Sequence, residues 1–280
     1  MNPGPAVLYV PADNVRAMAK ARTVDATALI FDLEDAVAPN AKADAREMLR
    51  SAWDANAERV RAIRINGIGT PHFTEDLLLA RKLMPDAIVL PKVESGDDLA
   101  TLDTALAETD APETLRVWAM IETPHGVLAA ERIAGFRGRI AGLILGTNDL
   151  TAALGAHADG ATAHLAIWRP HLVLAARSAG IFLLDGVTNE LRDARLIERE
   201  ARDGAALGFD GKTLIHPSQI APTLAAYRPS ERQVAEARAI VAAFDAVDDG
   251  VGVTTVDGRL AERLHLAAAR RILAKTGDAE

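Results

Sequence analysis

Polar residues with catalytic potential follow almost every short apolar run in this 280-residue sequence. Two carboxylates, Glu122 and Asp149, follow consecutive runs, and acids at the ends of adjacent parallel strands would converge on one point. Because two carboxylates completed by water and substrate oxygens suit Mg²⁺, we predict a Mg²⁺ site. Taken singly, each acid could instead cap a helix or form half of an ion pair. The polar groups are Asp32-Leu33-Glu34-Asp35, Arg64-Ile65-Asn66, Pro91-Lys92-Val93-Glu94, Glu122-Thr123, Asn148-Asp149, Asp185 and His216-Pro217.

Two basic side chains in the same kind of position suit an anionic substrate. The Arg64 guanidinium can bind a carboxylate through two parallel hydrogen bonds. It could also form a salt bridge with Glu34 or Asp35, and both interactions can hold at once. Lys92 could form a Schiff base with a carbonyl substrate or simply supply positive charge. Because Glu94, Glu34 and Asp35 would keep its ammonium protonated, we favour the electrostatic role.

The polar groups must be positioned by the elements that precede them. Each apolar run is almost continuous rather than alternating, which is typical of a strand buried on both faces of a parallel sheet. The segments between the runs have helical spacing, and eight strand–helix pairs predict an α/β protein with a (β/α)₈ TIM barrel. The competing open sheet would carry a glycine-rich turn after its first strand, and Val10–Asn14 has none. The runs are Ala6–Ala12, Ala28–Asp32, Val60–Asn66, Ala87–Pro91, Arg116–Ile121, Ile140–Leu145, Gly180–Leu184 and Gly211–Ile215.

A C-terminal segment continues beyond the last predicted strand. We predict a catalytic barrel over residues 1–228 and a helical extension or lid over residues 229–280, both parts of one domain. Within the extension, Ser230–Ala246 and Leu260–Ala274 are predicted helices, and Asp248–Val256 is a predicted turn. The extension could equally be a solvated cap or an oligomer contact.

The overall composition argues against several classes of protein. A formal net charge of −8 and an aromatic content of 4% are not typical of a nucleic-acid-binding protein. No apolar run reaches the roughly 18 residues of a membrane span, and the N-terminus lacks a signal-peptide pattern. There are no cysteines, so thiolate chemistry is excluded. We therefore expect a cytoplasmic protein with a sizeable core.

The ordered set of motifs resembles the citrate lyase β-subunit-like proteins of the HpcH/HpaI aldolase superfamily, which includes malyl-CoA and citramalyl-CoA lyases. The resemblance covers about residues 6–275. Any one motif is weak, but the ordered set is specific. The motifs are Tyr9-Val10-Pro11-Ala12, Phe31-Asp32-Leu33-Glu34-Asp35-Ala36-Val37, Arg64-Ile65-Asn66, Leu90-Pro91-Lys92-Val93-Glu94, Ile121-Glu122-Thr123-Pro124-His125-Gly126-Val127, Gly146-Thr147-Asn148-Asp149-Leu150 and Gly208-Phe209-Asp210-Gly211-Lys212-Thr213-Leu214-Ile215-His216-Pro217.

The resemblance implies roles for the residues at the strand ends. Glu122 and Asp149 would be the Mg²⁺ ligands, with Mg²⁺ as the only cofactor. Arg64 would bind the carboxylate of an oxo-acid such as oxaloacetate. Glu34 and Asp35 would lie beside Arg64 and hold it or a metal-bound water.

The resemblance also implies contacts with the oxo-acid part and with the CoA part of the substrate. The oxo-acid would also touch Glu122, Gly126 and Val127. Arg16 and Lys20, after the first strand, could meet the phosphates of CoA or of a carrier-protein arm. The implied assembly is a homotrimer or a dimer of trimers, with no nucleic-acid or membrane partner.

The implied reaction is Mg²⁺-dependent cleavage or formation of a C–C bond in a malyl-, citramalyl- or citryl-CoA-type thioester, with an oxo-acid and acetyl-CoA as the other partners. In thioester lyases of this family, an Asp in the lid of a neighbouring subunit protonates the enolate. The segment Gly252–Glu262 matches that lid but has Glu262 at this position, and we include Glu262 among the candidate catalytic residues. Two alternatives remain: an aldolase for free oxo-acids without CoA, and a non-catalytic protein that binds metal and oxo-acid.

Overall fold

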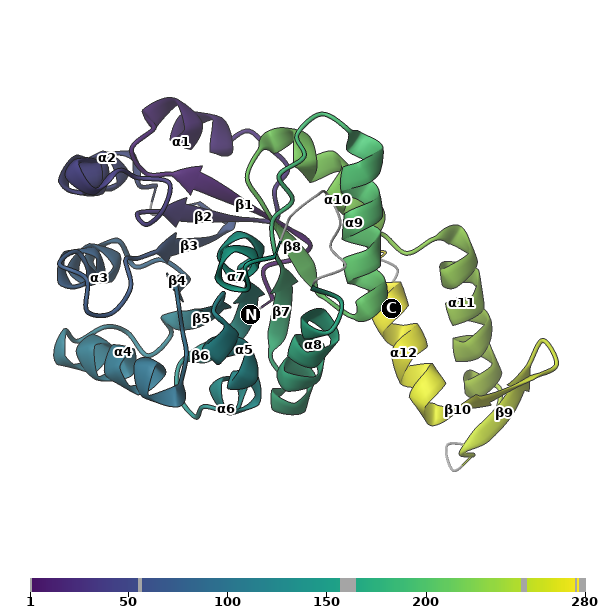
Figure 1. Cartoon of the computed structure of the whole chain (residues 1–280). Coiled ribbons are helices and arrows are strands. Elements are labelled where there is room, and N and C mark those ends of the chain that lie inside the picture. The colour runs from purple at the N-terminus through teal and green to yellow at the C-terminus, as the bar shows by residue number, and fades with distance from the viewer. Residues whose placement is uncertain (1, 55–56, 157–164, 248–250, 275, 277–280) are drawn as a thin grey trace. The chain divides into compact units, whose positions relative to one another are not determined.

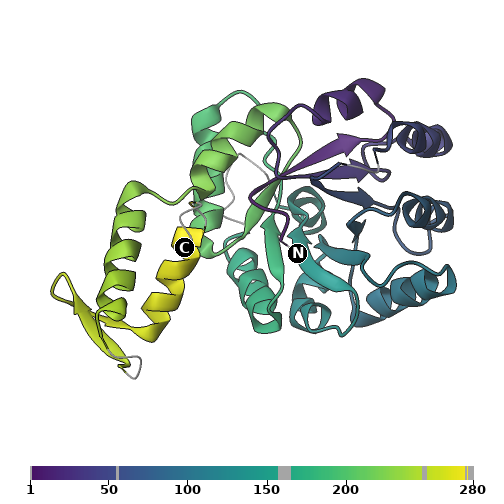
Figure 2. The ribbon, with the colours of Figure 1, turned by 180° about the vertical axis from the view of Figure 1, so that it is seen from behind.

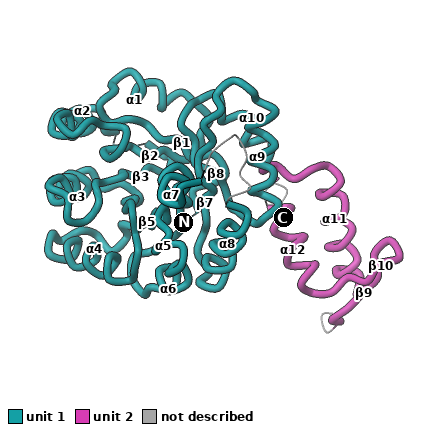
Figure 3. Tube along the Cα trace, in the orientation of Figure 1, with its two compact units in different colours: residues 1–226 teal, residues 227–280 magenta. Residues whose placement is uncertain are grey.

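The structure is a computed structural model that describes residues 2–54, 57–156, 165–247, 251–274 and 276. The chain divides into two compact units, residues 1–226 and 227–280 (Figure 3). This boundary lies close to the predicted division between residues 228 and 229, while membership of one domain stays a prediction. Among the described residues, no helix combines the length and the apolar character needed to span a membrane.

The first unit is built on eight parallel strands that pair in chain order and close into a barrel (Figure 1). The first strand pairs with both the second and the eighth, which completes the cylinder. The predicted (β/α)₈ barrel is therefore confirmed. The strands are β1 (Ala6–Pro11), β2 (Ala28–Asp32), β3 (Val60–Arg64), β4 (Ala87–Leu90), β5 (Arg116–Ile121), β6 (Ile140–Leu145), β7 (Phe182–Asp185) and β8 (Gly211–Leu214).

Helices alternate with the strands and form the outer layer of the barrel (Figure 2). Ser95 begins one helix with a capping box that includes Asp98, and Thr123 caps another whose first residue is Pro124. The described helices of this layer are α1 (Val15–Ala21), α2 (Lys42–Ala52), α3 (Phe73–Leu83), α4 (Gly96–Glu108), α5 (Pro124–Leu128), α6 (Ala130–Ala134), α7 (Thr147–Ala153), α8 (Trp168–Ala179), α9 (Ala194–Leu207) and α10 (Ile220–Tyr227), with the 3₁₀ turns η1 (Pro39–Ala41) and η3 (Pro217–Gln219).

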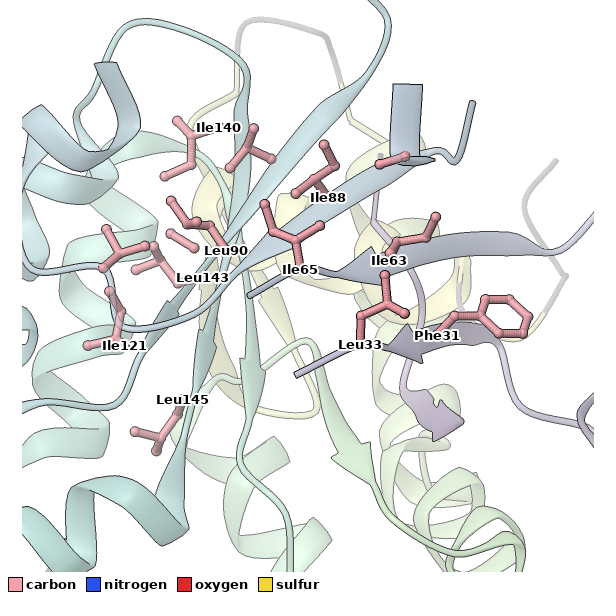
Figure 4. Close-up of a cluster of buried hydrophobic side chains, with 14 of the residues drawn as sticks. Phe31, Leu33, Ile63, Ile65, Ile88, Leu90, Ile121, Ile140, Leu143 and Leu145 are labelled. Carbon is pink, nitrogen blue, oxygen red and sulfur yellow. The ribbon is translucent and has the colours of Figure 1, made fainter. Parts of the chain in front are cut away.

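Two apolar clusters lie on opposite sides of the barrel wall, because successive strand residues point to opposite faces. The outer cluster packs the strands against the helices and includes the side chains labelled in Figure 4. The inner cluster fills the barrel, where Trp118 and Phe182 meet edge to face with ring centroids 5.3 Å apart. The barrel is thus a packed core rather than a channel.

Charged residues take over the inward-facing positions at the carboxyl ends of three strands. In each case a core side chain is followed, two residues later, by a charged side chain on the same inward face. The pairs are Ile30 and Asp32, Ala62 and Arg64, and Met120 and Glu122. The alternation that buries the core therefore also places these charges together in the mouth of the barrel.

The second unit contains two helices and a β-hairpin. Helix α11 (Glu231–Asp245) begins at Ser230, as predicted, through a capping box with Gln233. Strands β9 (Val253–Val256) and β10 (Arg259–Glu262) pair antiparallel, and helix α12 (Arg263–Ala274) follows. A small core of its own includes Phe244, Ala261 and Leu266.

The hairpin corrects two predictions. Val253–Val256 was expected within a turn, and Leu260–Glu262 within a helix, but both segments are strands; residues 248–250 of that turn lie outside the described residues. The signal is Asp257-Gly258, whose φ values of 49° and 76° are both positive. A two-residue turn of this kind matches the twist of paired strands, and Asp-Gly is a typical sequence for it.

Replacing Gly258 should loosen the hairpin selectively. A left-handed backbone costs a residue with a Cβ about 1–2 kcal/mol, so amide exchange over residues 253–262 should accelerate about tenfold in Gly258→Val. Asp257→Asn is the matched control, because Asn tolerates a positive φ. Equal exchange rates in the Gly258 variant and the parent chain would contradict this account of the turn.

Candidate active site

A buried ion pair between neighbouring strands forms the centre of the site. Arg64 donates from Nε and Nη2 to the two carboxylate oxygens of Asp32, over 2.7 and 2.6 Å. Its Nη1 lies 2.8 Å from Glu34 Oε2 and 3.8 Å from Asp35 Oδ2. Asp32 also accepts backbone N–H groups from Glu34 and Ala36, at 2.8 and 3.2 Å. The Nε–Nη2 edge of the guanidinium is therefore occupied by Asp32.

Lys92 connects Glu34 with Glu122. Its ammonium lies 2.7 Å from Glu34 Oε1, while its backbone N–H donates to Glu122 Oε1 over 2.9 Å. The backbone of Lys92 has a φ of 53°, which is uncommon for a residue with a Cβ. Burial opposes protonation, but the hydrogen bond and charge of Glu34 raise the pKa of Lys92 overall. A protonated amine is no nucleophile, so this geometry supports the electrostatic role.

Glu122 and Asp149 form a pair of acids, and within the described ranges neither makes a salt bridge, although the charge of Lys92 acts on Glu122. Glu122 follows β5 and is buried, whereas Asp149 lies in the first turn of α7. Burial, the charges of Glu34 and Asp149 and a hydrogen bond with Asp149 raise the pKa of Glu122 to about 8. A Cβ on Gly146 would lie 2.6 Å from Glu122 Oε2, so only glycine allows this close approach.

The acid pair fits a divalent cation of the hard, oxygen-binding kind. Among the described residues, no group of three or more His, Asp and Glu could hold a metal. Mg²⁺ usually takes only one or two carboxylates and keeps water or substrate oxygens in its other positions. A cation between Glu122 and Asp149 would also remove the repulsion that raises the Glu122 pKa.

A pocket of about 360 Å³ opens beside these groups. This volume is near the lower end of the range for small-molecule sites, which suits a compact acid. The pocket brings Arg64, Asp35, Glu122 and Asp149 together, as predicted, and Glu34 joins them through Arg64. Its lining also includes Tyr9, Asp32, Asn148 and Thr213.

Other predicted residues lie elsewhere in the first unit. Gly126 and Val127 are buried in α5 and are not among the described residues that line the pocket. A Cβ on Gly126 would lie 2.5 Å from the carbonyl oxygen of Val93, so Gly126 permits close packing. Arg16 and Lys20 are exposed on α1 and do not line this pocket either.

Glu262 belongs to the second unit, at the end of β10. Its side chain is partly buried, and its backbone N–H donates to Nδ1 of His265 over 2.9 Å. Its role in catalysis stays a prediction.

The sequence patterns assigned no role to Asp32 or Tyr9, although both lie in the site. Asp32 is the main partner of Arg64, although Glu34 and Asp35 were the expected ones. The available signal was the alternation along the strand, because Asp32 continues the inward-facing series while Leu33 leaves it. Tyr9 continues the same kind of series on β1, after Val7.

Residues 5–217 match the family described as HpcH/HpaI aldolase/citrate lyase. The chain belongs to this family. It is 38% identical to a (3S)-malyl-CoA thioesterase of Cereibacter sphaeroides over 277 residues, covering 98% of this chain and 95% of that protein. It is 36% identical to a citrate lyase subunit beta-like protein of Mycobacterium tuberculosis, covering 99% and 97%.

Solved structures of family members agree with the barrel. The CitE protein of Mycobacterium tuberculosis in complex with magnesium, acetoacetate and coenzyme A has a TM-score of 0.83 and 35% identity, with 98% of each chain covered. A citrate lyase beta subunit from the same organism, complexed with oxaloacetate and magnesium, has a TM-score of 0.72 and 38% identity, covering 82% of this chain and all of that one. The resemblance read from the motifs is confirmed.

Gly146→Ala should weaken cation binding without unfolding the barrel. The added methyl group would collide with both the Cβ and the Oε2 of Glu122 and so displace its carboxylate. We expect Mg²⁺ affinity to fall about tenfold or more, measured by calorimetric titration. Gly96→Ala is the control, since a Cβ built there would meet only Phe136 at an ordinary contact distance of 3.7 Å. Unchanged affinity in the Gly146 variant would contradict the assignment of Glu122.

Cation binding should also release a proton. Below about pH 8, Glu122 of the metal-free protein is largely protonated, and a metal ligand must be deprotonated. Mg²⁺ affinity should therefore rise up to about tenfold per pH unit as the pH approaches 8, and level off above it. Calorimetry in two buffers of different ionisation enthalpy measures the proton release, which Glu122→Gln should abolish. Affinity independent of pH between about 6 and 8 would contradict the raised pKa.

Proposed function

We propose that this chain is a Mg²⁺-dependent carbon–carbon lyase acting on a malyl-, citramalyl- or citryl-CoA-type thioester. Cleavage would give an oxo-acid and acetyl-CoA, and the reverse direction would form the bond. The observation that carries the proposal is the pair of buried Glu122 and partly buried Asp149 beside the Asp32–Arg64 ion pair in one small pocket. The related CitE structure with magnesium, acetoacetate and coenzyme A supports both the metal and the substrate class.

Glu122 and Asp149 would hold the Mg²⁺, which when bound supplies a Lewis acid for the oxygen on carbon 3. Arg64 presents positive charge to the anionic substrate, because Asp32 fixes its guanidinium in one orientation. Lys92 adds a second positive charge, held in place by Glu34. The chain thus supplies a preorganised charge distribution without a covalent intermediate.

Two proton transfers complete the cleavage. The hydroxyl on carbon 3 would lose its proton to water as the bond to carbon 2 breaks, and the electron pair of that bond would pass to the thioester fragment. The resulting enolate then takes up a proton at carbon 2 to become the acetyl thioester. We assign this second transfer to Glu262 of a neighbouring subunit, by analogy with the family's lid residue.

A second candidate is hydrolysis of the thioester, which would give the free 3-hydroxy acid and CoA. The identity of 38% to (3S)-malyl-CoA thioesterases, over nearly the whole chain, favours it. So does Glu262, since its side chain reaches one methylene further than the family's Asp. That reach would let its carboxylate activate a water for attack on the thioester carbonyl.

The two remaining alternatives, a free-acid aldolase and a non-catalytic binding protein, require less of the barrel mouth than a CoA enzyme does. A CoA enzyme needs basic groups there, and Arg16 is an exposed candidate at the start of α1, with Lys20 one turn further along. A free-acid aldolase or a non-catalytic binding protein would need neither. A homotrimer or dimer of trimers in the cytoplasm also stays a prediction.

Product analysis separates these functions. With Mg²⁺ and malyl-, citramalyl- and citryl-CoA, we expect an oxo-acid and acetyl-CoA from at least one substrate, detected by chromatography. Free 3-hydroxy acid and CoA would instead establish the thioesterase. Glu122→Ala should reduce turnover about a hundredfold or more, because it removes a metal ligand. Exposed Glu75 on α3 offers the matched control, Glu75→Ala. The absence of turnover with all three thioesters would contradict both the lyase and the thioesterase proposals.

A further inference from the structure

Most side-chain hydrogen-bond donors around the pocket are already used by the protein. The Thr147 hydroxyl donates to the carbonyl of Val187 over 3.0 Å, and the Thr213 hydroxyl donates to the carbonyl of Asp185 over 3.1 Å. The amide of Asn148 exchanges hydrogen bonds with that of Asn189. These groups line the pocket but have little free capacity to donate to a ligand.

The Arg64 guanidinium also donates to protein groups. Its Nε and Nη2 donate to the carboxylate of Asp32, and its Nη1 lies 2.8 Å from Glu34 Oε2. A substrate carboxylate could bind the Nε–Nη2 edge of Arg64 only by displacing Asp32, which would leave a buried carboxylate unpaired. A further side-chain donor beside Arg64 would therefore strengthen the binding of an anionic substrate.

Tyr9 supplies such a donor. It points inward from β1, lines the pocket and is partly buried. Its ring lies under the Arg64 guanidinium, with Cζ 4.9 Å from the ring centroid. Within the described parts of the chain, the Tyr9 hydroxyl has no hydrogen-bond partner.

We propose that the Tyr9 hydroxyl donates a hydrogen bond to the carboxylate of the bound oxo-acid and so determines the affinity for that half of the substrate. This inference rests on the proposed function. It assigns recognition of the carboxylate to a neutral donor beside Arg64, while Arg64 contributes charge from a fixed position.

The surroundings of Tyr9 favour binding over proton transfer. Burial raises the pKa of the phenol, and the carboxylates Asp32, Glu122 and Glu34 raise it further, against the lowering effect of Arg64. The phenol thus keeps its proton throughout the ordinary pH range and is a poor acid. Loss of the hydroxyl should therefore raise KM for the oxo-acid in the condensation direction more than it lowers kcat.

The test is Tyr9→Phe, which removes the hydroxyl but keeps the ring under Arg64. Calorimetric titration with glyoxylate, pyruvate and oxaloacetate, at saturating Mg²⁺, measures oxo-acid affinity directly. We expect Tyr9→Phe to weaken binding about tenfold to a hundredfold, because a hydrogen bond to a charged group is lost. Affinity for Mg²⁺ alone should stay the same. The chain has one other tyrosine, so Tyr227→Phe is the matched control and should leave both affinities unchanged.

Each outcome decides the matter. Equal oxo-acid affinity in Tyr9→Phe and the parent chain would overturn the inference and leave the proposed function intact. An equal loss of Mg²⁺ and oxo-acid affinity would also overturn it, since the hydroxyl would then act through the metal site. A parent chain that binds Mg²⁺ but none of the three oxo-acids would sink the proposed function, and this inference with it.

Discussion

The Arg64 guanidinium is buried in the mouth of the barrel, where a charge without partners would cost several kcal/mol. Asp32 offsets this cost with two short hydrogen bonds. The two residues are direct partners in the register of β2 and β3. A slip of one residue would turn one of them to the outer face of the wall, among apolar helix contacts. The register of these strands and the ion pair therefore stabilise each other.

Because acids pair with the cations of the site, an excess of negative charge is left there. Arg64 is neutralised by Asp32, and Lys92 by Glu34, so neither Glu122 nor Asp149 forms a salt bridge in the part of the chain that the structure describes. The backbone N–H of Lys92 is a partial substitute for Glu122 at 2.9 Å. Burial and this excess of negative charge together raise the pKa of Glu122, and a divalent cation would correct the charge imbalance. The metal preference thus follows from the ion pairs around the acids as much as from the acids themselves.

Chain-local patterns are enough to predict the barrel and its charged mouth. Continuous apolar runs identify the eight strands, and the strand-end rule brings Glu122, Asp149 and Arg64 together. The hairpin does not follow from apolar periodicity, because Val253 and Leu260 are 46% and 67% exposed. Its Asp-Gly turn is the feature that the pattern of hydrophobicity does not register.

The finer assignments depend on long-range geometry. Three acids lie within residues 32–35 at the end of β2, and only the pairing of β2 with β3 selects Asp32 as the main partner of Arg64. Gly126 follows Glu122 closely in sequence, yet it packs against the carbonyl of Val93 and lies outside the pocket lining. Tyr9 is separated from Arg64 by two strand crossovers. Sequence distance therefore does not indicate which residues meet across a closed barrel.

The barrel mouth alone does not choose between lyase and thioesterase chemistry. Both reactions bind the same kind of substrate and gain from positive charge near its oxygens, which Arg64, Lys92 and a metal would supply. They differ in one group, which either delivers a proton to carbon or activates a water. Within the described pocket lining, Glu122 and Asp149 would hold the cation, Asp32 is bound to Arg64, and Asp35 is the acid that remains. The proposed counterpart outside the barrel interior is Glu262, at the end of a hairpin strand of the second unit. Its carboxylate would reach one methylene further than that of an aspartate, so the proposed choice between the two reactions is a matter of position rather than acidity.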